Sequence, residues 1–183
     1  MTTNPTLSLE DLVSELEMAR RHSVDLVADL TPDQVAWRPH ANSSAIGWHL
    51  GHQAAVSHYM VRNLTAAEPP IDREFDQLFD SATVEPDRDP LPPLAAILDY
   101  RDAVAASTRV TLDRIIARDV QSPDQLTIVA SGLLHALINH EYQHSAWIGE
   151  VRDTMTDTPR RALESDHVTS IDGYWTIQPA QNE

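Results

Sequence analysis

The chain has 183 residues, of which 42% are hydrophobic, a length and composition typical of one domain with a single core. Its formal net charge of −15 argues against nucleic acid and anionic membranes as partners, because such a surface repels phosphate groups. The absence of cysteine excludes disulfides, thiolate metal ligands and a cysteine nucleophile, and the absence of lysine excludes Schiff-base chemistry.

Two helices are predicted in the first third of the chain, where apolar residues recur at the three-to-four spacing of an amphipathic helix. The first is expected over about 8–30, with Ser8 as its cap and Thr31-Pro32 ending it. The second is expected over about 42–64, because the run Asn42-Ser43-Ser44 can accept the free amide hydrogens of a first turn.

A proline-rich connection separates these helices from two more. Six of the twelve prolines lie between Pro69 and Pro93, which excludes regular helix for most of that stretch. Helical spacing returns over about 94–118 and about 124–152. The prediction is therefore an all-α four-helix bundle, whose long connection between the second and third helices crosses the bundle or covers a site.

The chain shows no internal boundary. No repeat or low-complexity tract divides it, so we predict a single domain over 1–183, with a helical core over about 8–152 and an irregular segment over about 153–183. It also contains no apolar run of membrane-spanning length and no signal-peptide pattern at its amino terminus. A cytoplasmic location is therefore expected.

Histidines on two predicted helices are the candidate chemical groups. His140 and His144, in the run NHEYQH, are four residues apart, so they project from one helix face and continue the apolar stripe of Leu137. The earlier run GWHLGH places His52 on the core stripe of its own helix, three residues after His49. Since any metal must be held by nitrogen or oxygen, we predict a divalent metal site formed by three histidines, with coordination positions open for water or substrate.

Alternatives to this open site remain at the level of sequence. A closed structural site would need a fourth ligand, and His49 is the nearby candidate. An H-x-x-x-H pair by itself is also compatible with ordinary buried histidines. Tyr59 and Trp147 lie on the same helix sides as the histidines, so they either line a pocket beside the metal or pack as core aromatics. The remaining histidines are expected to be surface or packing residues: His22, His40, His58, His135 and His167.

The two histidine runs, set in a four-helix pattern of this length, resemble the DinB superfamily, the DinB/YfiT-like metalloenzymes. The resemblance covers most of residues 8–152 and implies a four-helix bundle with a long crossover between helices two and three. It also implies that His52, His140 and His144 hold the metal, and that His49 supports a ligand or packs beside it. Members of the superfamily include transferases and isomerases that use low-molecular-weight thiols such as mycothiol or bacillithiol.

GWHLGH is also similar to the amino-terminal domain of the iron-dependent sulfoxide synthases of ergothioneine biosynthesis. Two departures count against that activity. The chain ends before any second catalytic domain, and Ala146 stands where the H-x-x-x-H-x-E pattern of those enzymes has glutamate.

The sequence is therefore compatible with three functions. The leading hypothesis is a metal-dependent thiol S-transferase, whose metal (zinc, nickel or iron) binds a low-molecular-weight thiol cosubstrate as thiolate for attack on an electrophile. The second is a non-haem iron protein that acts on thiol substrates with oxygen. The third is a non-catalytic metal or small-molecule binding protein, with which a homodimer is compatible. The fold alone does not choose among them.

Overall fold

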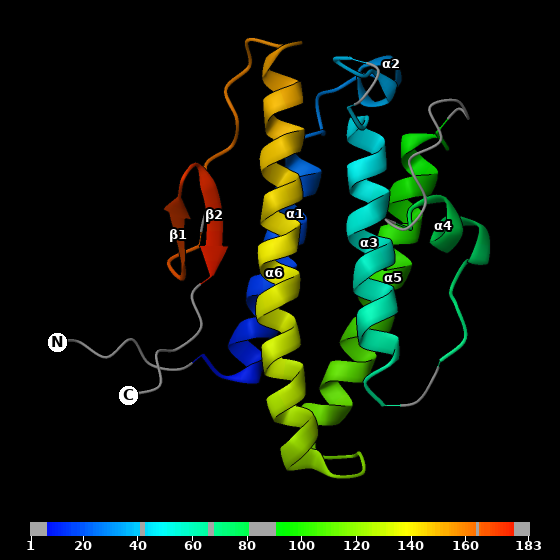
Figure 1. Cartoon of the computed structure of the whole chain (residues 1–183), viewed down its shortest axis with the longest axis vertical. Coiled ribbons are helices and arrows are strands. Elements are labelled where there is room, and N and C mark those ends of the chain that lie inside the picture. Colours follow the sequence, from blue (N-terminus) through cyan, green and yellow to red (C-terminus); the bar gives the residue numbers. More distant parts are fainter. Residues whose placement is uncertain (1–6, 41–42, 66–67, 81–90, 164, 178–183) are drawn as a thin grey trace, which may run out of the picture.

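The computed structural model describes residues 7–40, 43–65, 68–80, 91–163 and 165–177, and these residues are mostly helical. Four long helices lie side by side: α1 (Leu9–Asp25), α3 (Ile46–Arg62), α5 (Leu94–Ile116) and α6 (Pro123–Asp153) (Figure 1). The helix α6 packs against both α1 and α3, and α3 packs against α5. Helices α3 and α6, which carry the two histidine runs, therefore face each other. No described helix is both long and apolar enough to cross a membrane.

The first helix is shorter than predicted. A capping box begins α1, since Ser8 Oγ accepts from the Asp11 N–H at 3.1 Å and Asp11 Oδ2 accepts from the Ser8 N–H at 3.1 Å. The helix ends at Asp25 instead of about residue 30. Thr31 then caps a separate short helix, α2 (Pro32–Ala36). The Thr-Pro pair is thus a start signal, because proline is well tolerated in the first turn of a helix.

The predicted cap of the second long helix is wrong. Helix α3 begins at Ile46, and its N-cap residue Ala45 makes no side-chain cap bond. Ser43 Oγ instead donates to the His40 carbonyl at 2.9 Å and accepts from the His40 N–H at 3.2 Å, closing a local turn. Asn42, the first residue of the expected cap, lies outside the described residues.

The proline-rich connection contains one short helix, α4 (Arg73–Leu78), and residues 81–90 lie outside the described part of the chain. Asp72 caps α4, because its Oδ1 accepts from the N–H groups of Glu74 at 2.9 Å and Phe75 at 3.1 Å. The residue that follows α4, Phe79, is fully buried against α3. This segment therefore brings one backbone carbonyl beside His52 in the GWHLGH run.

The carboxy-terminal segment, predicted to be irregular over 153–183, contains a β-hairpin. Strands β1 (Val168–Ile171) and β2 (Tyr174–Ile177) pair antiparallel around Asp172 and Gly173, which have φ values of 51° and 88°. Two positive φ values match a type I′ turn, which Asp-Gly favours. Asn139 Oδ1 accepts from the Ile177 N–H at 2.7 Å, so the hairpin lies against α6.

A polar network occupies the interior where the long helices meet. Arg101 Nη2 donates to Glu141 Oε1 at 2.6 Å, and Arg101 Nη1 donates to the Leu50 carbonyl at 2.6 Å and to Gln53 Oε1 at 2.9 Å. Gln53 Nε2 in turn donates to the Glu141 carbonyl at 2.8 Å. Gln53 and Glu141 each follow a predicted ligand by one residue, so the network fixes how α3 and α6 are rotated toward each other.

Candidate metal centre

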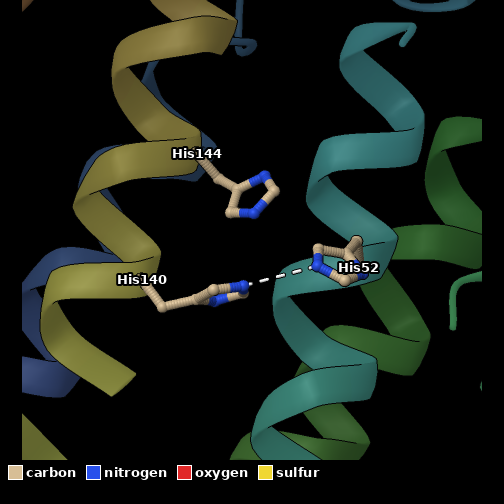
Figure 2. A group of neighbouring side chains, drawn as sticks. All are labelled: His52, His140 and His144. Carbon is tan, nitrogen blue, oxygen red and sulfur yellow. Dashed lines mark hydrogen bonds between the residues drawn. The ribbon is translucent and has the colours of Figure 1, made fainter. Parts of the chain in front are cut away.

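Three histidines meet between α3 and α6. His140 and His144 point from adjacent turns of α6 toward His52 on α3 (Figure 2). Each ring offers one nitrogen, and the three nitrogens lie within 4.8 Å of one another. The Nε2 atoms of His52 and His140 are 3.4 Å apart. Two ligand nitrogens on one tetrahedral ion, each about 2.0–2.1 Å from it, are separated by about 3.3 Å, so this pair already has the spacing of two ligands.

A backbone carbonyl sets the tautomer of His52. His52 Nδ1 lies 2.8 Å from the Phe79 carbonyl oxygen. A carbonyl only accepts, so Nδ1 carries the hydrogen and Nε2 keeps its lone pair on the side of His140. Metal-binding histidines ordinarily donate their second N–H to such a partner, which fixes the ring and raises its basicity. The donor set thus fits a divalent cation.

Gly51 makes room for this arrangement. A Cβ atom at Gly51 would overlap the Phe79 ring, so a side chain there would push Phe79 away from α3. A glycine in a helix interior lowers helix stability by about 1 kcal/mol relative to alanine. At Gly51 this loss is offset by the contact that brings the Phe79 carbonyl to His52. Trp48 holds the other side of that imidazole, stacking on it with a centroid distance of 4.6 Å.

We expect Gly51→Ala to weaken metal binding about 10- to 100-fold although it removes no ligand, because it displaces the carbonyl that orients His52. Competition with a chromogenic chelator measures the affinity. Gly132→Ala is the matched control, since a Cβ at Gly132 meets no atom within 4 Å. Equal metal affinity in the two variants would show that Phe79 does not support the site.

His49 lies directly behind one of the three histidines. Its Nδ1 is 2.8 Å from His144 Nδ1, so one ring donates to the other. When His144 is the donor, its Nε2 is left with a lone pair for the cluster. The group that could hold a metal consists of His52, His140 and His144 and does not include His49. His49 thus contacts a predicted ligand and lies outside the group of three histidines.

The two aromatic candidates differ in their surroundings. Trp147 meets the His144 ring edge-on, with a centroid distance of 4.9 Å. Together with His49, it lines a cavity of about 310 Å³ beside the cluster. Tyr59 is 60% exposed, so the expectation of a core aromatic is wrong for this residue. It lines a separate cavity of about 730 Å³ between α3 and α4, which also includes Asp80.

Burial keeps the clustered imidazoles neutral. Loss of hydration and the neighbouring His52 lower the pKa of His140 to about 4, and burial with the surrounding histidines lowers the pKa of His144 to about 2. Burial also lowers the pKa of His52, although its bond to Phe79 and the nearby Asp80 oppose this change. At neutral pH the three rings therefore present lone pairs, and a cation does not have to displace a proton from an imidazolium.

Three of the other histidines have partners outside the cluster, whereas His40 lines the cavity that also includes His49 and Trp147. His58 is buried, and its Nε2 accepts from the Ile71 N–H at 3.2 Å. His135 Nδ1 donates to the Ser131 carbonyl of its own helix at 2.8 Å. His167 lies 4.0 Å from Glu15 at the surface. These contacts are those of packing and surface residues.

Comparison with known families agrees with this geometry. A family model described as the DinB superfamily matches residues 15–148, which is well over half of the chain. The chain belongs to the DinB superfamily. The matched range of this DinB-superfamily protein contains the three clustered histidines and their partners His49 and Phe79. No curated protein matches the chain.

Sequence reasoning missed two parts of the centre in this DinB-superfamily protein, namely Phe79 and the stacked ring of Trp48. A backbone carbonyl has no residue-type signature, so Phe79 had no direct signal. The nearest indication was Gly51, a glycine inside a predicted helix and next to a candidate ligand, which marks a close approach by another segment.

Proposed function

We propose that this DinB-superfamily protein binds one divalent metal ion through His52, His140 and His144. The observation that supports it best is the convergence of three neutral imidazoles, with the tautomer of His52 set by the Phe79 carbonyl. In this proposal, α1, α3, α5 and α6 form the four-helix bundle of the family, and the connection between α3 and α5 is its long crossover. Three protein ligands leave coordination positions for water or substrate.

We further propose that the protein is a thiol S-transferase. The chain has no cysteine, so a sulfur nucleophile must come from a cosubstrate, here a low-molecular-weight thiol such as mycothiol or bacillithiol. The bound metal would lower the pKa of that thiol from about 8.5, so that thiolate exists at neutral pH. The thiol proton leaves to solvent, sulfur forms a bond to an electrophilic carbon, and the leaving group departs with its electron pair.

The protein's own residues provide orientation and access. His49 holds the His144 ring, and Phe79 and Trp48 hold the His52 ring, so the ligands are positioned before the metal arrives. We assign the small-molecule substrates to the cavity lined by His49 and Trp147, two residues whose rings contact the ligand His144. A thiol pool of this kind exists in a reducing cytoplasm, where we place the protein. Its net charge of −15 supports small molecules over nucleic acid as partners.

The proposed transferase activity is tested by measuring thiol alkylation with each metal in turn. Protein without a histidine tag is loaded with zinc, nickel or iron, and mycothiol or bacillithiol is alkylated by monochlorobimane with release of chloride. We expect thiol-dependent fluorescence above the uncatalysed rate, its loss on chelation and its return when metal is added back. His135→Ala is the control that should retain activity. Turnover that survives complete chelation would rule out the mechanism.

The same preparations separate the other two candidates. Three histidines with open positions also suit ferrous iron, so a product that forms only with iron and oxygen would favour the non-haem iron protein. Stoichiometric metal with no thiol-dependent turnover would favour a binding protein.

A further inference from the structure

A second cavity lies on the opposite side of the interior from the histidines. It has a volume of about 470 Å³, within the usual range of ligand pockets, and lies mainly between α1 and α5. In Figure 1 these two helices lie behind α3 and α6, which carry the metal centre. Ala54 of α3 and Glu141 of α6 also line the cavity, so it reaches the central polar network.

Arg20 lines this cavity with a charge that is not neutralised. Its Nη2 donates to Ser57 Oγ at 2.7 Å, and no described carboxylate lies within ion-pair distance of it. The nearest buried carboxylate, Glu141, already pairs with Arg101 at 2.6 Å. Burial and the nearby Arg101 lower the pKa of Arg20 to about 10, although Glu141 and Glu17 oppose this change. Two guanidinium groups thus share one carboxylate, and the inner end of the cavity keeps an excess positive charge.

The rest of the lining combines apolar residues with charged ones, of which Glu17, Arg109 and Asp25 are paired, while Arg21 and Asp102 also line the cavity. Arg109 pairs with Glu17 at 2.9 Å at the rim, and Asp25 pairs with Arg161 at 2.6 Å. The walls between rim and inner end are formed by small or branched apolar residues: Val24, Ala54, Val104, Ala105 and Ala106. Apolar walls around a guanidinium that has no ion-pair partner of its own favour a ligand with an apolar body and a carboxylate.

We propose that the cavity between α1 and α5 binds a small apolar carboxylate, whose oxygens accept hydrogen bonds from Arg20. The planar guanidinium matches a carboxylate, and no described carboxylate lies within ion-pair distance of Arg20. A dianion such as phosphate fits less well, because Glu141 and Asp102 also line the cavity. The site shares no residue with the metal centre and stands independently of the proposed transferase activity.

Benzoate is the probe, with benzyl alcohol as its uncharged counterpart, and NMR titration of the full-length chain measures binding. We expect benzoate to bind and benzyl alcohol to bind at least about tenfold more weakly, as expected for a hydrogen bond to a charged group. Arg20→Gln should weaken benzoate binding by a similar factor, and Ala105→Phe should do so by filling the cavity. Arg114→Gln, at an exposed residue of α5 outside the cavity lining, should change it by less than about twofold.

His52→Ala distinguishes this site from the metal centre. Benzoate binding that persists in His52→Ala and falls in both Arg20→Gln and Ala105→Phe supports the proposal. It is overturned when wild type fails to bind benzoate, when benzyl alcohol binds equally well, or when His52→Ala is the variant that loses binding. Circular dichroism shows whether each variant is folded. If Arg20→Gln does not fold, the loss of benzoate binding in Ala105→Phe is the test of the proposal.

Discussion

His52→Ala and His144→Ala are expected to lose nearly all bound metal, whereas the wild-type chain carries close to one ion per molecule. Each variant removes one of three ligands that are already close together, with nitrogens within 4.8 Å. The affinity loss should exceed the 10- to 100-fold effect of removing a supporting partner. Elemental analysis of protein purified without a histidine tag measures the metal, and added zinc should raise the unfolding temperature of wild type alone.

His135→Ala is the matched control for these variants, because His135 lies on the same helix and bonds to its own backbone at Ser131. It should keep the metal. The ligand variants should stay folded, since the apolar clusters around α1, α3, α5 and α6 do not include the three histidines. Metal retained in both ligand variants would mean that these histidines do not hold it, and unfolding of both would mean that they are structural.

The histidine cluster could be predicted because it follows from helical periodicity. His140 and His144 are one turn apart, so any helix over this run presents both rings on one face. His52 was assigned to the cluster because it lies on the core side of its own helix. Sequence alone could not give the rotation of α3 against α6, which depends on side chains distant in sequence, such as Arg101 bonding to Gln53 and Glu141.

The helical spacing over about 124–152 predicts one apolar stripe on α6 that runs from Val129 through Leu137 to the histidines. This prediction was right near the histidines and wrong at the beginning of the helix. Leu137 is buried, but Val129 is 55% exposed. Helix α6 contacts α1 on one side and α3 on another, and its α1 side buries Ala130, Leu134 and Ile138. A helix with two buried faces has no single stripe, so periodicity does not say which face is covered at each turn.

The hairpin was missed although its turn carries a recognised signal. Asp172-Gly173 favours a type I′ turn, but the strands beside it are only four residues long and largely exposed. A two-stranded hairpin is marginal by itself, and this one lies against α6, where Asn139 bonds to Ile177. That support comes from a residue 38 positions away, which local patterns do not show.

Glu141→Leu is expected to destabilise the fold by about 3–5 kcal/mol, the typical cost of leaving a buried ionic partner unpaired. Glu141 and Arg101 are 3% and 6% exposed, and Glu141 also accepts from Ser23 Oγ at 3.0 Å. Urea unfolding measures the change. Asp113→Asn is the control, because its exposed pair with Arg109 should contribute less than about 1 kcal/mol.

The double variant Arg101→Met/Glu141→Leu tests the physical reason for that loss. Removing both charges eliminates the unpaired guanidinium, so the double variant should be more stable than Glu141→Leu alone. Recovery should be incomplete, because Gln53 and the Leu50 carbonyl also lose their bonds to Arg101 and stay buried. Equal stability of Glu141→Leu and Asp113→Asn would show instead that water solvates the central pair. The network could not then be what fixes α3 against α6 and brings His52 to face His140.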